Sequence, residues 1–465
     1  MNFQFVNTTI AALATPPGVG ALGVIRLSGP DAIAIADAVF RGRKPLASVK
    51  GYTVHFGEII GEIISGNGGE ISGKEGDVRV IDEVLATVFR APRSFTGEDV
   101  VEFSAHGSPF VLGQILELLL EKGARLAEAG EFSQRAFLNG KMDLAQTEAV
   151  ADLIHAETAA QQKSALHQMR GGFSGELNTL REELIRLTAL LELELDFSDE
   201  DVEFADRDAL FRIIDELFRK GESLTESFRL GNVIKNGVRV AIIGKPNAGK
   251  STLLNAMLRE DRALVSDIAG TTRDVIEETL TIGGILFRLI DTAGIREHTT
   301  DQIEQMGIAR SHENAAKADI IIALRAATDP DESLMEGLES FSPKTIAVVS
   351  KADVVGQGGL HDGQLYLSAK TGEGLEALQE LLVQKATGGR LQEGTVVTNV
   401  RHQQALVKML ANLRVVQEGL QSGLSGDLLT IDIRQALYWL GTITGKVEID
   451  RDVLGAIFSQ FCIGK

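Results

Sequence analysis

Residues 238–252 read VRVAIIGKPNAGKST, and this stretch decides the fold of the central part of the chain. An apolar, β-branched run at 238–243 is typical of a buried strand, and residues 252–258 have a helix-forming composition. The pattern G-x-x-x-x-G-K-[ST] between them is completed by Gly244, Gly249, Lys250 and Ser251. In this pattern the loop amides and a helix N-terminus converge on a phosphate, Lys250 reaches the β- and γ-phosphates, and Ser251 ligates Mg²⁺. A glycine-rich turn without a ligand is the alternative, which the flanking strand and helix disfavour.

The length and composition limit the class of protein. A chain of 465 residues is expected to form about three domains. Its one cysteine, Cys462, excludes an intrachain disulfide and indicates a reducing compartment. Without a basic leader or a long apolar run, we expect a soluble cytoplasmic protein. With 46 basic and 65 acidic residues the formal charge is −19, so any RNA contact would be local or shared with a partner.

The first part of the chain, residues 1–140, carries short apolar runs broken by glycine, proline and asparagine. Strands are predicted at Ala21–Leu27, Gly51–Ile64 and Ile81–Arg90. A helix with one apolar face is predicted at Phe110–Lys122, where Gly123 would end it. These patterns indicate an α+β domain.

Two stretches of this domain are richer in polar residues than packing requires. Residues 94–107, SFTGEDVVEFSAHG, are expected to bring together Glu98, Asp99, Glu102 and His106 around a turn. Residues 130–141, GEFSQRAFLNGK, combine two phenylalanines with Arg135, Asn139 and Lys141. From the residues alone, a turn before a half-solvated strand and a helix start with a solvated basic edge are the favoured interpretations.

The rest of the chain alternates between helical and α/β composition. Residues 141–234 and 390–465 have apolar residues at helical spacing, with long C-terminal helices expected at Val396–Leu424 and Leu428–Leu440. Residues 235–389 alternate strand and helix patterns in the manner of a parallel α/β sheet. We therefore expect one all-α domain, split in sequence, with an α/β domain inserted into it.

Within the α/β segment, one hairpin is predicted from two central glycines. Glu277–Ile282 and Ile285–Asp291 flank Gly283-Gly284, which adds an antiparallel edge strand. Further strands are predicted at Asp319–Leu324, Thr345–Val349 and Gln364–Leu367, and the last helix of this segment at Gly374–Lys385.

Three motifs follow the phosphate loop in the order found in small GTPases. The first, a loop that would complete Mg²⁺ coordination and sense the γ-phosphate, contains Gly270, Thr271, Thr272, Arg273 and Asp274. The second, a strand end that would hold the metal through water, contains Asp291, Thr292, Ala293 and Gly294. The third is formed by Ser350, Lys351, Ala352 and Asp353, with Ser368, Ala369 and Lys370 as the remaining base loop. Asp353 would accept hydrogen bonds from the guanine N1–H and N2–H₂ edge, which adenine does not offer, so GTP is the expected nucleotide.

Two positions depart from the usual pattern. Ser350 stands where GTPases usually have asparagine, and its shorter side chain would make one fewer amide contact, so we expect weaker guanine binding. Ile295 stands where Ras-like enzymes place the glutamine that orients the attacking water. Hydrolysis would therefore be organised differently.

The whole chain resembles the tRNA-modification GTPases of the MnmE/TrmE family. The markers are Thr15–Gly18 (TPPG), Gly23–Gly29, SFTGEDVVEFSAHG, GEFSQRAFLNGK, GKPNAGKS and the terminal Cys462, Ile463, Gly464 and Lys465. The resemblance implies an N-terminal α+β folate-binding domain that dimerises, an all-α domain split in sequence, and an inserted Ras-like P-loop GTPase domain.

The resemblance also implies a set of nucleotide and metal ligands. The GTP-binding residues would be Asn247, Ala248, Gly249, Lys250, Ser251, Thr252, Ser266, Asp267, Ile268, Ala269, Gly270, Thr271, Thr272, Asp291, Thr292, Ala293, Gly294, Ser350, Lys351, Ala352, Asp353, Ser368, Ala369 and Lys370. Ser251 and Thr272 would hold Mg²⁺. A K⁺ ion between two GTPase domains of a homodimer would be held by Asn247, Ser266, Ile268 and Thr271, and would neutralise developing phosphate charge.

Four residues are candidates for catalysis. Glu304 matches the water-positioning glutamate of the family, with an ordinary helix-surface glutamate as the alternative. Arg273 and Asp274 belong to the loop that would sense the γ-phosphate. Cys462 would lie near a folate pocket, although composition alone favours a small apolar residue.

A folate and two macromolecular partners are implied as well. Arg26, Glu102 and Lys141 would bind 5-formyltetrahydrofolate, a one-carbon donor, with Lys465 contributing from the C-terminal tail. An FAD-dependent protein of the GidA type would join the homodimer in a heterotetramer. Together they would add an aminomethyl or carboxymethylaminomethyl group to C5 of the wobble uridine of certain tRNAs.

Two rival functions remain open on the sequence. A ribosome-assembly switch of the Era or EngA kind would bind rRNA and modify nothing, but it would need a KH module or a second phosphate loop. An interaction scaffold that binds GTP without turnover is the other alternative.

Overall fold

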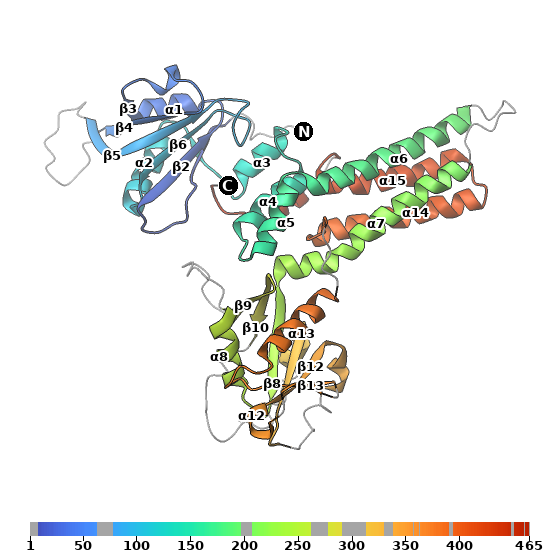
Figure 1. Cartoon of the computed structure of the whole chain (residues 1–465). Coiled ribbons are helices and arrows are strands. Elements are labelled where there is room, and N and C mark those ends of the chain that lie inside the picture. The colour runs from blue at the N-terminus through green and yellow to red at the C-terminus, as the bar shows by residue number, and fades with distance from the viewer. Residues whose placement is uncertain are drawn as a thin grey trace. The chain divides into compact units, whose positions relative to one another are not determined.

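The computed structural model describes most of the chain (Figure 1). The described residues are 8–62, 78–196, 207–261, 278–290, 313–329, 338–356, 358–361, 363–389, 394–447, 451–459 and 461–464. The chain divides into two compact units, Met1–Ala151 with Thr444–Lys465, and Asp152–Ile443. No helix within the described ranges combines the length and the apolar character that crossing a membrane requires.

The first unit contains a seven-stranded sheet in the order β3-β4-β5-β6-β2-β1-β7. Its strands are β1 (Ile10–Leu13), β2 (Leu22–Ser28), β3 (Phe40–Gly42), β4 (Thr53–Glu62), β5 (Val78–Phe89), β6 (Val100–His106) and β7 (Arg125–Leu126). All neighbours pair antiparallel except β1 and β7, which pair parallel. The three predicted strands are confirmed as β2, β4 and β5. From Val101 to His106, β6 alternates buried residues with half-buried or exposed ones, as expected of a strand with one solvated face.

Two helices, α1 (Ala32–Val39) and α2 (Pro109–Glu121), contact the central strands of this sheet. Leu112, Ile115 and Leu119 repeat at helical spacing along α2 and enter the same buried cluster as Phe103 of β6. Burial of each such side chain stabilises the fold by about 1.5–3 kcal/mol. The predicted helix at Phe110–Lys122 is confirmed, and Gly123 follows it with φ +107°, a value that favours glycine.

The remainder of the first unit brings the two ends of the chain together. It consists of α3 (Glu131–Leu138), α4 (Leu144–Ile154) and α16 (Arg451–Phe458). Leu144, Leu454 and Phe458 are buried in one cluster. After α16, Ile463 forms an antiparallel bridge with Ala129, so the C-terminal tail is held next to the start of α3.

The helical part of the second unit contains α5 (Ala159–Met169), α6 (Gly172–Asp196), α7 (Arg207–Asn236), α14 (Val400–Gln421) and α15 (Gly426–Thr444). Helix α7 packs against both α6 and α14. The predicted helices are therefore confirmed, but α14 begins four residues later than Val396. The reason is local, because the Asn399 side chain accepts a hydrogen bond from the Arg401 amide and caps the helix. The preceding residue Val397 donates instead to Ser227 Oγ of α7.

The second sheet has seven strands in the order β13-β14-β12-β11-β8-β10-β9. They are β8 (Val238–Gly244), β9 (Glu278–Ile282), β10 (Ile285–Leu289), β11 (Ile320–Ala326), β12 (Thr345–Ser350), β13 (Gly359–His361) and β14 (Gln364–Tyr366). The five inner strands are parallel, as predicted. The predicted hairpin is confirmed, with φ values of +57° and +80° at Gly283 and Gly284. The sequence did not predict β13, which is short and antiparallel to β14.

The faces of this sheet are both covered. Val240 and Ile242 of β8 enter one buried cluster, which also contains residues of α8 (Lys250–Asp261) and α13 (Leu375–Thr387). Ala241 and Ile243 alternate with them and enter a second cluster. Strands buried on both faces read as continuous apolar runs, which explains why this segment was recognisable in the sequence.

Candidate functional site

The loop that joins β8 to α8 adopts a tight, partly left-handed turn. Asn247 and Gly249 have φ values of +62° and +95°. Gly244 lies so close to β11 that a Cβ atom there would be 2.6 Å from the Leu324 carbonyl oxygen, so only glycine fits. The turn leads directly into the N-terminus of α8, which is the geometry that favours an anion.

The Lys250 side chain folds back over this loop. Its ammonium group donates to the carbonyl oxygens of Gly244 at 2.6 Å and Lys245 at 2.9 Å. Burial lowers the pKa of Lys250 below its ordinary value, because desolvation disfavours the charged form. The amine is thus held at the loop by neutral acceptors, which phosphate oxygens could replace.

The end of β12 is tied to the same loop. Ser350 is buried, and its hydroxyl donates to the carbonyl oxygen of Ala248 at 2.6 Å. The Arg325 carbonyl oxygen lies farther from this hydroxyl, at 3.2 Å. Because a hydroxyl has a single proton, the shorter bond takes it. The serine therefore links the expected base-reading loop to the phosphate loop.

The other two parts of the expected base-reading region also meet. Ser368 Oγ donates to Asp353 Oδ1 at 2.8 Å. The Ala352 amide donates to the Leu367 carbonyl at 3.1 Å, and Lys351 adopts a left-handed φ of +59°. Tertiary hydrogen bonds thus join three motifs that lie far apart in the sequence.

A cavity of about 140 Å³ opens beside the phosphate loop. Residues that line it include Lys245, Asn247, Ala248, Arg325, Asp329 and Lys351. Lys245 and Asp329 form an ion pair at 3.7 Å. The sequence did not predict Arg325 and Asp329 as site residues. The available signal was their position at the carboxyl end of the predicted strand that became β11, because ligands of parallel sheets bind at that edge.

Several predicted site residues lie outside the described ranges, and the structure gives no geometry for them. They are Ser266, Asp267, Ile268, Ala269, Gly270, Thr271, Thr272, Arg273, Asp274, Asp291, Thr292, Ala293, Gly294, Ile295, Glu304 and Lys465. Among the residues that are described, no group of three or more His, Cys, Asp and Glu side chains could hold a metal ion.

A second candidate site lies in the first unit around Arg26. Arg26 of β2 faces Glu102 of β6 in register, and its Nε donates to Glu102 Oε1 at 2.7 Å. Both side chains are partly exposed, at 22% and 24%. The guanidinium carbon lies 5.8 Å from the ring centre of Phe95 and 5.6 Å from that of Phe132. Arg26 Nη1 also lies 3.4 Å from the Gly464 carbonyl oxygen.

The other residues expected at this site approach the same region. Lys141 Nζ donates to the Pro92 carbonyl at 3.0 Å, at the start of the loop that carries Phe95. Cys462 is exposed, and its carbonyl oxygen accepts from the Gly130 amide. The structure thus brings the tail and Arg26 together, and Lys141, which follows α3, contacts the loop that carries Phe95.

One expectation about this region is wrong. Glu98, Asp99, Glu102 and His106 do not form a cluster. Glu98 and Asp99 precede β6, and Glu102 and His106 lie farther along this extended strand. Each has a different partner: Arg135 for Glu98, the Ala91 amide for Asp99, Arg26 for Glu102 and Asp82 for His106.

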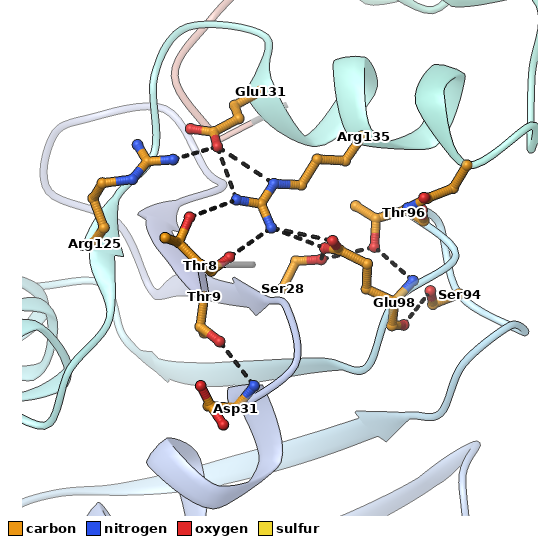
Figure 2. A network of polar contacts seen from close by, with 11 residues as sticks. Thr8, Thr9, Ser28, Asp31, Ser94, Thr96, Glu98, Arg125, Glu131 and Arg135 are labelled. Atoms are coloured by element: carbon orange, nitrogen blue, oxygen red, sulfur yellow. Dashed lines mark hydrogen bonds and ion pairs between the residues drawn. The ribbon is translucent and has the colours of Figure 1, made fainter. Parts of the chain in front are cut away.

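The buried partner of this group is Arg135, which the sequence assigned to a solvated edge. Arg135 is instead 5% exposed. Figure 2 shows its guanidinium between two carboxylates, with Nη1 3.2 Å from Glu98 and Nη2 2.9 Å from Glu131. Burial raises the pKa of Glu131, but hydrogen bonds from Arg125, the Glu128 amide and Arg135 outweigh burial and hold it below its ordinary value of 4.5.

Comparisons with known proteins cover almost the whole chain. The family model described as the MnmE helical domain matches residues 144–462, and the one described as the GTP-binding protein TrmE N-terminus matches residues 9–141. A tRNA modification GTPase MnmE from Christiangramia forsetii is 47% identical over 99% of this chain and 100% of its own length. The protein of the same name from Cytophaga hutchinsonii is 50% identical over 98% of each chain.

Proposed function

The chain belongs to the MnmE family of tRNA modification GTPases, and from this premise we propose that it hydrolyses GTP in the service of tRNA modification. Residues 235–389 form the Ras-like GTPase domain, inserted between the parts 141–234 and 390–465 of a helical domain. Residues 1–140 bind folate and dimerise.

One observation supports the nucleotide site most strongly. The left-handed turn at Asn247 and Gly249 leads into α8. Over this loop, the amine of Lys250 donates to the neutral carbonyl oxygens of Gly244 and Lys245. Asp353, held by Ser368, selects guanine through its N1–H and N2–H₂ edge. Ser251 and Thr272 hold Mg²⁺, which neutralises charge on the phosphates.

Hydrolysis is proposed to depend on K⁺ and on pairing of two GTPase domains in a homodimer. The side chain of Asn247 is exposed, and its amide oxygen is a neutral oxygen ligand of the kind that suits K⁺. Ser266, Ile268 and Thr271 are proposed as the other ligands of this ion. Glu304 positions the attacking water, since Ile295 provides no side chain for that role. Arg273 and Asp274 complete the catalytic loop.

The one-carbon donor is proposed to be 5-formyltetrahydrofolate, bound by Arg26, Glu102 and Lys141 with Lys465. The chemistry of these groups fits a folate, because Glu102 offers acceptors for the donor edge of the pterin ring and the three cations suit the carboxylates of the folate's glutamate part. Cys462 of the adjoining tail is a candidate for the chemical step. With an FAD-dependent partner of the GidA type in a heterotetramer, the protein modifies C5 of the wobble uridine.

The potassium mechanism is tested by GTP turnover in KCl and in NaCl at equal ionic strength. The parent is expected to turn over faster in KCl, and Asn247→Ala to lose that difference. Equal parent rates in both salts would refute the mechanism.

The modification is tested separately by nucleoside analysis of tRNA from cells that lack this protein. Unmodified wobble uridine is the expected result. An unchanged tRNA profile would favour a ribosome-assembly switch instead.

A further inference from the structure

We propose that Arg135 is a positioning residue for the Arg26 site. By bridging Glu98 and Glu131, it fixes the two segments that flank Arg26, namely the loop of residues 91–99 and helix α3. The inference rests on the proposed folate binding, since its main readout is affinity for that ligand.

The first step concerns what Arg135 joins. Glu131 belongs to α3 itself, whereas Glu98 belongs to the loop before β6. Arg135 also donates to the Thr8 carbonyl at 2.8 Å, which adds the chain entering β1 (Figure 2). A planar guanidinium has five N–H donors in a fixed fork, so it can hold all three partners in one geometry, which a lysine could not.

The second step connects this network to Arg26. Glu98 Oε2 accepts a 2.6 Å hydrogen bond from Ser28, which is two residues beyond Arg26 on β2 and therefore on the same face of the strand. Phe95, on the loop, and Phe132, on α3, are the two rings beside the Arg26 guanidinium. The two segments that Arg135 ties together are thus the ones that wall the Arg26 side chain.

The third step extends the argument to Lys141. Asn139 Nδ2 donates to the Thr96 carbonyl at 2.7 Å, and Lys141 contacts the same loop at Pro92. Gly97 has φ +81° and lies so close that a Cβ atom there would be 3.2 Å from the Asn139 Cβ. A displaced loop would therefore move the Lys141 amine as well as the Phe95 ring.

Charge balance explains why the network is tolerated in the interior. Two arginines, Arg125 and Arg135, face two carboxylates, Glu98 and Glu131. Such a buried group adds little net stability over apolar side chains of the same volume, so its role is to fix the geometry of the segments it joins.

The test measures the affinity of the full-length protein for 5-formyltetrahydrofolate by calorimetry. Arg135→Gln is expected to weaken binding by roughly tenfold or more, as expected when a buried charge pair loses one partner. Arg125→Gln is the matched control, because Arg125 contacts the same carboxylate, Glu131, and its side chain is 34% exposed. Its affinity is expected to stay within about twofold of the parent.

A double-mutant cycle separates positioning from general damage. If Arg135 acts by positioning this site, the double variant Arg26→Ala/Arg135→Gln loses less affinity than the sum of the two single losses. Additive losses would overturn the proposal. A circular-dichroism spectrum and a thermal unfolding profile like those of the parent check that Arg135→Gln is folded. If that variant does not fold, the near-isosteric Glu98→Gln takes its place with the same expected result.

Failure of folate binding itself has a different signature. A parent protein that binds no 5-formyltetrahydrofolate refutes the folate assignment, and hydrogen exchange then decides the role of Arg135. Faster exchange of the amides in residues 91–99 of Arg135→Gln, with Arg125→Gln unchanged, supports the positioning role. Equal exchange in Arg135→Gln and the parent overturns it.

Discussion

The Arg26 site and the phosphate loop hold their cations in opposite ways. Arg26 and Arg135 are each bonded to carboxylates, so their charge is balanced within the protein. Lys250 is bonded to two backbone carbonyls, and burial lowers its pKa. A cation paired with carboxylates is fixed in place, whereas a cation held by neutral acceptors still gains from an incoming anion. The first arrangement serves geometry and the second serves binding.

The largest effect expected from this contrast is on stability in the first unit. Glu131→Ala removes the buried carboxylate that both Arg125 and Arg135 contact and leaves Arg135 with Glu98 as its carboxylate partner. Removing one partner of a buried ion pair destabilises by about 3–5 kcal/mol. Denaturant unfolding of the unit measures this free energy. The control Glu58→Ala removes the exposed pair with Arg41 and should change it by less than about 1 kcal/mol. Equal losses in both variants would mean that the network is no more than a surface pair.

The second largest effect should be on GTP affinity, with little change in the free energy of unfolding. Lys250→Met removes the amine that faces the phosphates, and we expect GTP affinity to fall about 100-fold because a charge-assisted contact is lost. Titration with a fluorescent GTP analogue measures the affinity. Lys317→Met, which disrupts an exposed pair with Glu313, is the control and should bind like the parent. If Lys250→Met unfolded at a markedly lower denaturant concentration than the parent, Lys250 would also stabilise the fold, which would contradict the contrast between the two sites.

The phosphate loop was predictable because its determinants are local. Five turn residues between a strand and a helix fix the position of Lys250. The buried parallel strands are recognisable in the sequence as continuous apolar runs. Gly283 and Gly284 similarly fix a hairpin. These features follow from neighbours in sequence, so pattern and structure agree.

The interior of the first unit was not predictable, because its determinants are tertiary. Glu98 and Arg135 are 37 positions apart, and each stretch alone is typical of a solvated edge. Only the fold turns Arg135 inward, where it meets Glu98 and Glu131. The short strand β13 and the contact of Ser350 with Ala248 were missed for the same reason.

A third and smaller effect is expected on lowering the pH. The pKa of Glu131 is held below 4.5 in the folded protein, so its contribution to stability is present above that value and is lost as the pH falls through the folded pKa. The parent should therefore lose stability in acid more steeply than Glu131→Gln, which has no carboxyl group to protonate. Thermal unfolding between neutral and acidic pH measures the difference. Parallel pH profiles would indicate that the network is not maintained by the charge on Glu131.

The smallest effect is expected for Ser350, whose hydroxyl forms a neutral hydrogen bond with the backbone of the phosphate loop. Ser350→Ala deletes one hydrogen bond to Ala248, which is worth about 0.5–1.5 kcal/mol, so GTP affinity should fall by roughly two- to tenfold. Since the single hydroxyl proton is used in that bond, Ser350 has no proton left to donate to the base. ITP, which lacks the N2 amino group, should then lose affinity by the same factor as GTP, and Asp353→Ala should abolish the preference between them. If Ser350→Ala instead lost affinity for GTP but not for ITP, Ser350 would contact guanine. The hydrogen bond from Ser350 to the Ala248 carbonyl would then not be what links the base-reading loop to the phosphate loop.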